Sequence, residues 1–335
     1  MLNRFALSLL ATLLVSNAFA QLPNPVLTDV FPRGAQIGTS VDVTISGRDV
    51  DEPTKLIFTH PGIQGQVKRT AATEFEVAKN SSNQFSVQVA ENVPPGIYEA
   101  RSVGRFGVST PLPFVIHRQA QAVEAGDNHA PEKATPVLLP SVVFGRADGN
   151  QTDYYKISVE NESTISIRCL GSELISRIEP VVSILQLNGR PLKRSRTVRD
   201  TTLTHTFAKG GEYLVAIHDG VYGGGGDYPY ALQITNQSVI DMVLPVAGVP
   251  GEITEFTFYG RNLVGGQDSP YEIDKHRLSM FTRKIYVPTA QELLQSYTSV
   301  GGLRSLSYRH GLDDDVASGV EASIGLAAAP VMVEA

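Results

Sequence analysis

The chain has 335 residues, a formal net charge of −6, 20 prolines, 30 glycines and one cysteine. Its acidic and basic residues are dispersed, which argues against the basic stripe that nucleic-acid binding needs, and a single cysteine excludes intramolecular disulfides. Abundant proline and glycine without long helical periodicity favour an all-β fold of short strands and turns.

Residues 1–20 have the pattern of a signal peptide. Arg4 supplies the positive start, an apolar run follows, and Ala18-Phe19-Ala20 is a cleavage site. The apolar run is too short to span a bilayer core of about 30 Å. We therefore expect an exported protein that starts at Gln21, has no transmembrane segment after cleavage, and lies in the periplasm, at the cell surface or outside the cell.

Residues 21–118 are expected to form a first β-sandwich. Apolar residues alternate with polar ones at 41–45, which is typical of a strand with one buried face. The run Pro94-Pro95-Gly96 fixes the backbone ahead of another strand. With further short apolar runs, including one at 75–77, about seven strands fit an immunoglobulin-like sandwich.

Residues 119–237 are expected to form a second, jelly-roll-like sandwich. Residues 119–140 are rich in alanine, proline and charge, which is typical of a linker that becomes an edge strand. Asn188-Gly189 predicts a tight hairpin, and Cys169 is expected in the core rather than as a reactive thiol. Alternating strands are predicted at residues 154–159, 164–169, 181–187, 202–207, 213–217 and 228–234.

The stretch Val239–Leu263 repeats Val26–Val50 without a gap, at an offset of 213 positions. The matched residues are Pro32 with Pro245, Gly38 with Gly251, Gly47 with Gly260, Arg48 with Arg261, and Asp49 with Asn262. Self-similarity at a fixed spacing is typical of modular arrays. Residues 238–335 are therefore expected to begin a second immunoglobulin-like sandwich.

The remainder of this third module is less regular. Thr289-Ala290-Gln291-Glu292 has the capping-box pattern and predicts a short helix, and strands are expected at 305–308 and 327–332. Val123-Glu124-Ala125 returns as Val333-Glu334-Ala335. We therefore expect a repeating unit of about 210 residues and a chain that ends before a further module.

The turn and core residues of the first module resemble those of the IPT/TIG family. The matching residues are Val43-x-Ile45-x-Gly47, Pro94-x-Gly96-x-Tyr98, Gly107-x-Ser109 and Phe114-Val115. The resemblance implies immunoglobulin-like domains of the kind common in cell-surface and exported multidomain proteins. It does not indicate a ligand.

The second module resembles the bacterial pre-peptidase C-terminal domain. The matching residues are Asp153-Tyr154-Tyr155-Lys156-Ile157, Gly171-Ser172, Asn188-Gly189, Gly211-Glu212-Tyr213-Leu214-Val215 and Asp227-Tyr228-Pro229-Tyr230-x-Leu232. The resemblance implies a secreted, non-catalytic β-sandwich attached to peptidases and other exported proteins, for substrate or matrix binding or for handling after export.

Some members of that family hold Ca²⁺ between the linker and the turn before the first strand. The residues here that match these positions are Glu124, Asp127, Asn128, Asp148 and Asp153. Their oxygens are the ligand type that Ca²⁺ prefers, but the family's Glu-Pro-Asn-Asn is here Gly126-Asp127-Asn128-His129. No cofactor is therefore expected, with bound Ca²⁺ as the open alternative to a solvated acidic linker.

Other chemistry-bearing residues are interpreted as structural. His218-Asp219 has no serine on a strained turn to complete a triad, and Gly223–Gly226 precedes Asp227 where a phosphate-binding loop needs lysine. Asp313-Asp314-Asp315 is either a cation ligand or, as the simpler reading, a solvated loop. We therefore expect that the chain is not an enzyme.

The favoured hypothesis is a non-catalytic exported protein for adhesion, scaffolding or binding to an extracellular protein or polysaccharide surface. Tyr222, Tyr228 and Tyr230 are candidate ligand contacts beside the glycine-rich loop, with core packing as the alternative for Tyr228 and Tyr230. The second hypothesis is an N-terminal accessory region of a secreted peptidase or other hydrolase whose catalytic domain is not in this chain. A pure spacer is a third.

Overall fold

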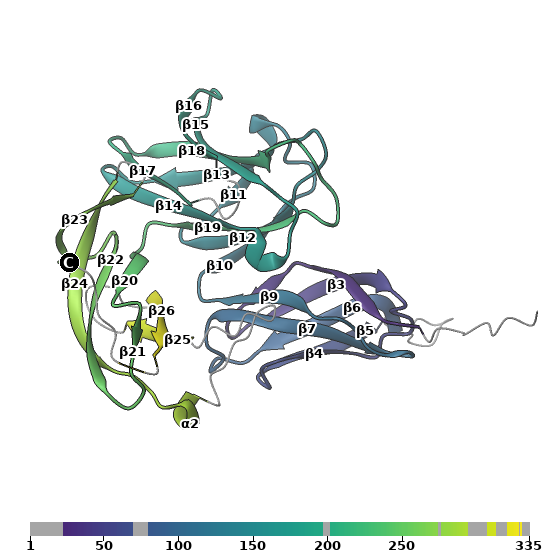
Figure 1. The fold of residues 1–335 in the computed structure, drawn as a ribbon. Helices are drawn as coiled ribbons and strands as arrows, with labels where there is room; N and C mark the ends of the chain where they lie inside the picture. The colour runs from purple at the N-terminus through teal and green to yellow at the C-terminus, as the bar shows by residue number, and fades with distance from the viewer. Residues whose placement is uncertain are drawn as a thin grey trace, which may run out of the picture.

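The structure is a computed structural model that describes residues 23–69, 80–196, 202–273, 276–293, 307–312, 320–327 and 329. It confirms the all-β prediction, because strands make up nearly all of the regular structure in these ranges. Figure 1 shows three groups of strands, formed by residues 26–117, 120–235 and 239–326. The helical segments in these ranges are single turns: η1 (Pro131–Lys133), η2 (Ser172–Leu174) and α2 (Ala290–Leu293).

The first unit is one sheet in the order β1-β3-β6-β5-β4-β7-β9-β2, with β8 paired to β7. Its strands are β1 (Val26–Phe31), β2 (Gly34–Gln36), β3 (Ser40–Arg48), β4 (Lys55–Phe58), β5 (Ile63–Arg69), β6 (Asn80–Val89), β7 (Gly96–Gly104), β8 (Gly107–Val108) and β9 (Leu112–His117). Val30 near one end of the sheet and Phe114 near the other belong to the same buried cluster, so the sheet folds over onto itself. The strand expected at 75–77 lies outside the described residues.

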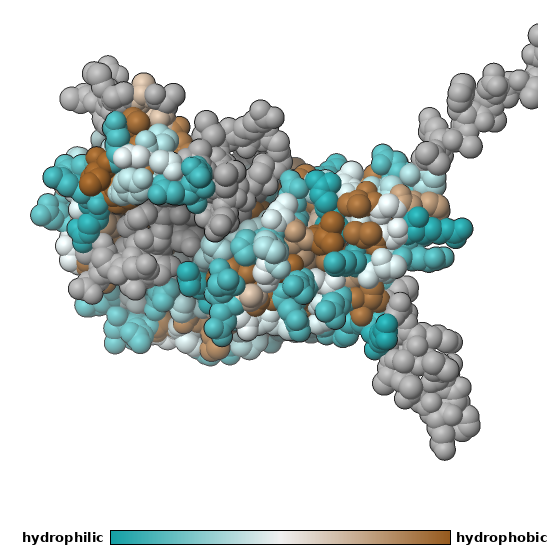
Figure 2. Space-filling model, turned by 90° about the horizontal axis from the view of Figure 1, so that it is seen from below, coloured by the Kyte–Doolittle hydropathy of each residue, from teal (hydrophilic) through white to brown (hydrophobic). Residues whose placement is uncertain are grey.

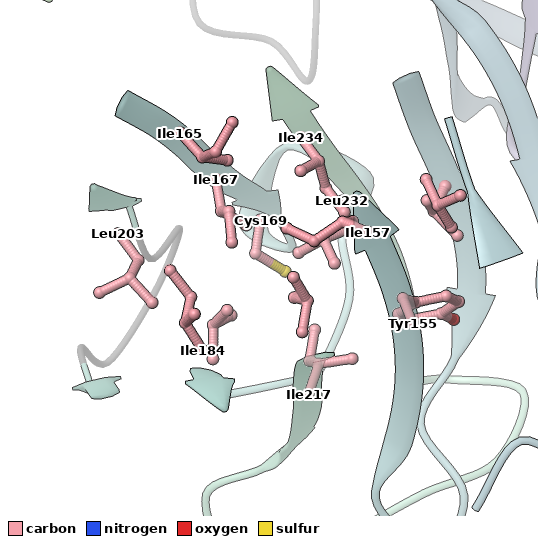
Figure 3. Packing of buried hydrophobic residues seen from close by; sticks show 14 of the residues in the cluster. Tyr155, Ile157, Ile165, Ile167, Cys169, Ile184, Leu203, Ile217, Leu232 and Ile234 are labelled. Atoms are coloured by element: carbon pink, nitrogen blue, oxygen red, sulfur yellow. The ribbon is translucent and has the colours of Figure 1, made fainter. Parts of the chain in front are cut away.

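The second unit consists of two five-stranded sheets, β10-β12-β19-β14-β17 and β11-β13-β18-β15-β16. Their strands are β10 (Ala120–Val123), β11 (Thr135–Val137), β12 (Ser141–Arg146), β13 (Asp153–Val159), β14 (Ser163–Leu170), β15 (Pro180–Gln186), β16 (Pro191–Arg196), β17 (Thr202–Phe207), β18 (Gly211–Asp219) and β19 (Pro229–Thr235). Side chains from both sheets meet around the buried Cys169 (Figure 3). The expected linker supplies a parallel edge strand to each sheet, β10 beside β12 and β11 beside β13.

The third unit has a four-stranded sheet, β20-β22-β24-β23, and a three-stranded sheet, β21-β26-β25. Their strands are β20 (Val239–Leu244), β21 (Ala247–Gly248), β22 (Ile253–Arg261), β23 (Gln267–Ile273), β24 (His276–Tyr286), β25 (Ser307–Leu312) and β26 (Val320–Leu326). The capping box is confirmed, because Glu292 accepts hydrogen bonds of 2.8 Å from both the backbone and the hydroxyl of Thr289. The strand expected at 327–332 lies largely outside the described residues, and the strand that pairs with β21 is β26, which ends at Leu326.

The two repeated stretches have the same backbone structure. β1 pairs with β3, and β20 with β22, in registers that differ by the same 213 positions as the sequences, and each pair has a bulge at the same place. Gly38 and Gly251 have φ of 73° and 86°, and Asp49 and Asn262 have φ of 56° and 52°. The sequence repeat is therefore also a repeat of strand pairing and turn geometry.

The first and second units share a buried interface. Its apolar part consists of Ile97, Val115, Val142, Phe144, Leu170, Leu174 and Ala231. Beside it, the buried Arg33 donates a 2.5 Å hydrogen bond to the carbonyl of Leu174, and Asp29 pairs with Arg146. The two units are therefore joined by a buried apolar interface of their own and by polar contacts beside it.

The third unit contacts the second through the turn Gly260-Arg261-Asn262, which corresponds to Gly47-Arg48-Asp49 in the sequence repeat. Arg261 is 1% exposed, forms a 3.1 Å ion pair with Asp241, and donates a hydrogen bond to the hydroxyl of Thr204. Asn262 donates a 2.9 Å hydrogen bond to the carbonyl of Thr164. The second unit is therefore held on both sides by specific contacts.

The surface is mixed in character. Seen from below, hydrophobic side chains are interspersed with hydrophilic ones over the described part of the molecule (Figure 2). None of the helices in the described residues has the length and apolar character needed to cross a bilayer.

Candidate functional site

Three loops meet at one end of the second unit. They are residues 147–152, 171–179 and 219–228. Asn150 donates its backbone N–H to the carbonyl of Tyr222 at 3.1 Å, and Gly225 donates to Ala147 at 2.9 Å. Gly220 donates to the carbonyl of Glu179 at 2.7 Å. Main-chain hydrogen bonds therefore fix the loop that carries Tyr222.

Asp219 organises this loop. Its carboxylate is buried and accepts backbone hydrogen bonds from Glu179 at 2.8 Å, Val221 at 3.1 Å and Gly223 at 2.8 Å. The neighbouring His218 has Nδ1 2.8 Å from the carbonyl of Asp219 and Nε2 3.2 Å from Arg194 Nη2. The carboxylate therefore holds loop backbone rather than orienting the imidazole, which is the opposite of its role in a catalytic triad.

The glycine-rich run is needed for close packing at Gly224. A Cβ atom there would lie 2.1 Å from the backbone nitrogen of Gly149. By contrast, a Cβ atom at Gly226 would meet nothing within 4 Å. The loop thus packs directly on the turn that carries Asp148.

The three candidate tyrosines have different environments. Tyr230 is 1% exposed, and the half-buried Tyr228 packs against the core. Only Tyr222 is well exposed, at 45%, and its ring stacks on His218 with centroids 4.4 Å apart and an interplanar angle of 3°. Ligand contact therefore stays a prediction for Tyr222, and Tyr230 takes the alternative role in the core.

Two further residues belong to this surface and were missed in the sequence. Tyr154 is half-buried on the outward face of β13. Burial raises the pKa of its phenol, and the nearby Tyr222 and Glu132 add to the shift. Arg194 comes from β16 and reaches His218. Alternation could have found Tyr154, because its neighbour Tyr155 points into the core.

Four of the five predicted metal ligands lie close together. Glu124 Oε2 accepts a 2.7 Å hydrogen bond from the backbone of Arg146 and lies 3.4 Å from the hydroxyl of Tyr230. That hydroxyl donates to Asp153 Oδ2 at 2.7 Å. Asn128 is buried beside β13, the strand that carries Asp153, and Asp148 approaches the cluster from the turn before that strand. The fifth, Asp127, lies at the surface and pairs with Lys133 at 3.1 Å.

Two carboxyl groups of this cluster have raised pKa values. Burial raises the pKa of Glu124 to about 7, and the nearby Asp153 and Asp148 add to the shift. Burial likewise raises the pKa of Asp153 to about 6, against the opposing effects of the Tyr230 hydrogen bond and His129. The folded protein therefore binds protons at this cluster more tightly than the unfolded chain does.

We expect the second unit to lose stability as the pH rises from about 4 to about 8. The pKa values of Glu124 and Asp153 are higher in the folded protein than in the unfolded chain. Their contribution to stability is therefore complete at low pH and is lost as the pH rises through the folded pKa values. The Glu124 shift alone corresponds to at most about 3 kcal/mol. Thermal melts across this range should show the trend, and Glu124→Gln should flatten it. A flat profile in the wild type would contradict the prediction.

The donor set, as arranged, does not fit a calcium ion. Asn128 Oδ1 is buried without a hydrogen-bond donor within the described ranges, which favours a cation. However, His129 Nε2 lies 3.3 Å from Asp148 and 3.4 Å from Asp153, between the two carboxylates that would have to share the ion. In the ranges that the structure describes, no three histidine, cysteine or acidic side chains form a group able to hold a metal ion.

Bound calcium therefore stays the untested alternative to an acidic linker without a metal, and a melting experiment distinguishes the two. We expect millimolar Ca²⁺ and a chelator to give the wild type the same melting temperature. His129→Asn, which frees the space between Asp148 and Asp153, is the matched variant in which a calcium-dependent rise should appear. A rise in the wild type would restore the original site. Asp313-Asp314-Asp315 lies outside the described residues.

No protein-family model matches the chain, and no curated protein matches it. Among solved structures, it is similar to the pre-peptidase C-terminal domain of a collagenase from Bacillus anthracis, with 18% identity over 30% of this chain and 94% of that one (TM-score 0.26). It is also similar to PliG, a periplasmic inhibitor of g-type lysozyme from Aeromonas hydrophila, with 14% identity over 35% and 98% (TM-score 0.26). A third is SGBP-B of a Bacteroides ovatus mixed-linkage glucan utilisation locus, solved with a heptasaccharide, with 9% identity over 56% and 72% (TM-score 0.20).

These likenesses are partial and distant. A pre-peptidase C-terminal domain is among the neighbours, and the resemblance of the second unit to that family stays a prediction. The resemblance of the first and third units to the IPT/TIG family stays a prediction. The surface around Tyr222 is therefore interpreted from its own geometry.

Proposed function

We propose that this chain is a non-catalytic, exported binding protein whose second unit presents Tyr222 to a polysaccharide. The observation that carries the proposal is the parallel stack of Tyr222 on His218 at an exposed loop. One ring face is covered by the imidazole, and the ring is held parallel to it. A flat aromatic face of this kind packs well against the C–H face of a sugar ring and gains a large contact area.

We call the stacked rings of Tyr222 and His218 the Tyr222 platform. This platform is held in place before a ligand binds. Asp219 fixes the loop backbone through three hydrogen bonds, and Arg194 contacts the ring of His218. A tyrosine has few rotatable bonds, and fixing it in advance lowers the entropy lost on binding. Arg194 and the hydroxyl of Tyr154 then supply polar groups at the edge, as a sugar ligand requires.

The same proposal includes export and modular construction. The signal-peptide pattern at residues 1–20 supports export, and the shared register of β1/β3 and β20/β22 supports a division at 21–118, 119–237 and 238–335. The buried contacts between the units favour a fixed scaffold that holds the binding face. An accessory role beside a hydrolase domain would use the same face.

Tyr222→Ala is expected to weaken polysaccharide binding at least about tenfold, which corresponds to about 1.4 kcal/mol. Ligands would first be identified on a glycan array and then measured by isothermal titration calorimetry. Tyr271→Ala is the matched control, because Tyr271 in the third unit is 44% exposed and Tyr222 is 45% exposed. Equal affinities for the two variants would contradict the proposal, and binding to a matrix protein alone would replace the polysaccharide with a protein partner.

A further inference from the structure

A polar recess lies where the three units meet. Its volume is about 540 Å³, which is within the range of small-molecule sites. The floor is the outward face of the sheet β10-β12-β19-β14-β17, and it includes Gln233, Thr235 and Arg168. One wall is residues 115–118 of the first unit, and the other is residues 239–241 of the third.

The walls of this recess are fixed by the interfaces on either side. On the first-unit side, the apolar cluster and the hydrogen bond from Arg33 to Leu174 attach β9 to the second unit. On the third-unit side, Arg261 binds both Thr204 and Asp241, and Asp241 itself lines the recess. The recess therefore exists before a ligand enters it, and its shape does not depend on a mobile linker.

Apart from Arg118, which is exposed at the rim, the charged groups around the recess are paired with one another. Arg168 forms a 2.7 Å ion pair with Glu173, and Asp241 forms its ion pair with Arg261. A charged ligand would have to compete with these existing pairs, whereas a neutral ligand leaves them intact. The pairing therefore favours a ligand without net charge.

The remaining lining is rich in hydroxyl and amide groups. Gln233 offers an amide, and Thr202 and Thr235 offer hydroxyls, all on half-buried side chains. Within the described residues, no phenylalanine, tyrosine or tryptophan lines the recess. Binding there must depend on hydrogen bonds rather than on stacking, and an apolar ligand would leave these polar groups without partners.

We infer that this recess is a second binding site, separate from the Tyr222 platform, for a neutral hydroxyl-rich ligand such as the end of a saccharide chain. The choice of a saccharide rests on the proposed function. The existence of the recess and the preference for an uncharged ligand do not. The Tyr222 platform would hold a chain by stacking, and the recess would hold a chain end by hydrogen bonds.

The test uses the full chain and a set of named probes. Cellohexaose, maltohexaose and xylohexaose are the neutral probes, and hexagalacturonate is the charged one. Gln233→Trp fills the floor of the recess, and Gln233→Ala removes the amide without adding bulk. Gln186→Trp is the matched control, since Gln186 is an equally half-buried glutamine on β15 in the other sheet. Melting temperatures identify any variant that fails to fold.

We expect a neutral probe to bind, with an affinity lowered at least about tenfold by Gln233→Trp, lowered less by Gln233→Ala, and unchanged by Gln186→Trp. If Tyr222→Ala abolished binding and both Gln233 variants bound as the wild type does, the recess would not be a binding site and the proposal for Tyr222 would stand. If only the Gln233 variants lost affinity, the recess would be the binding site and the proposal for Tyr222 would be wrong. Preference for hexagalacturonate, or no binding by any probe, would overturn the inference of a neutral saccharide site.

Discussion

Arg261→Ala is expected to lower the free energy of unfolding of the third unit by about 3–5 kcal/mol. The side chain is 1% exposed and pairs with Asp241, whose carboxyl has a pKa already raised by burial. Without the guanidinium, this carboxylate stays buried with its principal counter-charge gone, and Thr204 loses its donor across the interface. The variant should therefore both destabilise the third unit and loosen its attachment to the second.

The sequence repeat provides the control for this experiment. Arg48 occupies the equivalent position of the first unit with the same strand register, but its side chain is 71% exposed. Arg48→Ala is expected to change stability by no more than about 0.5 kcal/mol. Differential scanning calorimetry would measure both variants, with hydrogen exchange in β20 and β22 locating the change. Similar losses in the two variants would show that the buried pair is not what holds the interface.

This contrast shows where sequence reasoning succeeds and where it stops. The corner at Gly47 and the one at Gly260 were recognisable as one structure because turns and strand alternation are local properties. The same sequence pattern gave no sign that Arg261 is buried and Arg48 exposed. That difference comes from the neighbouring unit, which covers one corner and not the other, and no local pattern records it.

In the candidate site, too, some features could be predicted from the sequence and others could not. The resemblance placed Glu124, Asn128, Asp148 and Asp153 on segments that the fold does bring together. It did not predict that His129 would lie between two of these carboxylates, because the ring position depends on how the linker passes β13. Likewise, alternation puts Tyr228 and Tyr230 on one face, but only the packed sandwich decides that this face is the core.

Tyr155→Ala is expected to be the most damaging change in the second unit, at about 3–5 kcal/mol. The ring is fully buried and belongs to the core cluster formed by both sheets, as Figure 3 shows. Its hydroxyl lies 2.6 Å from that of Tyr230, which in turn donates to Asp153. The alanine variant therefore leaves a cavity and also removes one member of a buried polar chain.

Two variants separate these contributions. Tyr155→Phe keeps the ring and removes only the hydroxyl, so the expected loss is about 1 kcal/mol. Tyr154→Ala alters the next residue of β13, whose half-buried side chain lies on the outward face, and should cost no more than about 1 kcal/mol. Calorimetric unfolding and hydrogen exchange in β13 and β18 would measure all three. If Tyr154→Ala cost as much as Tyr155→Ala, the assignment of the two faces of β13 would be wrong, and with it the outward position of Tyr154 beside Tyr222.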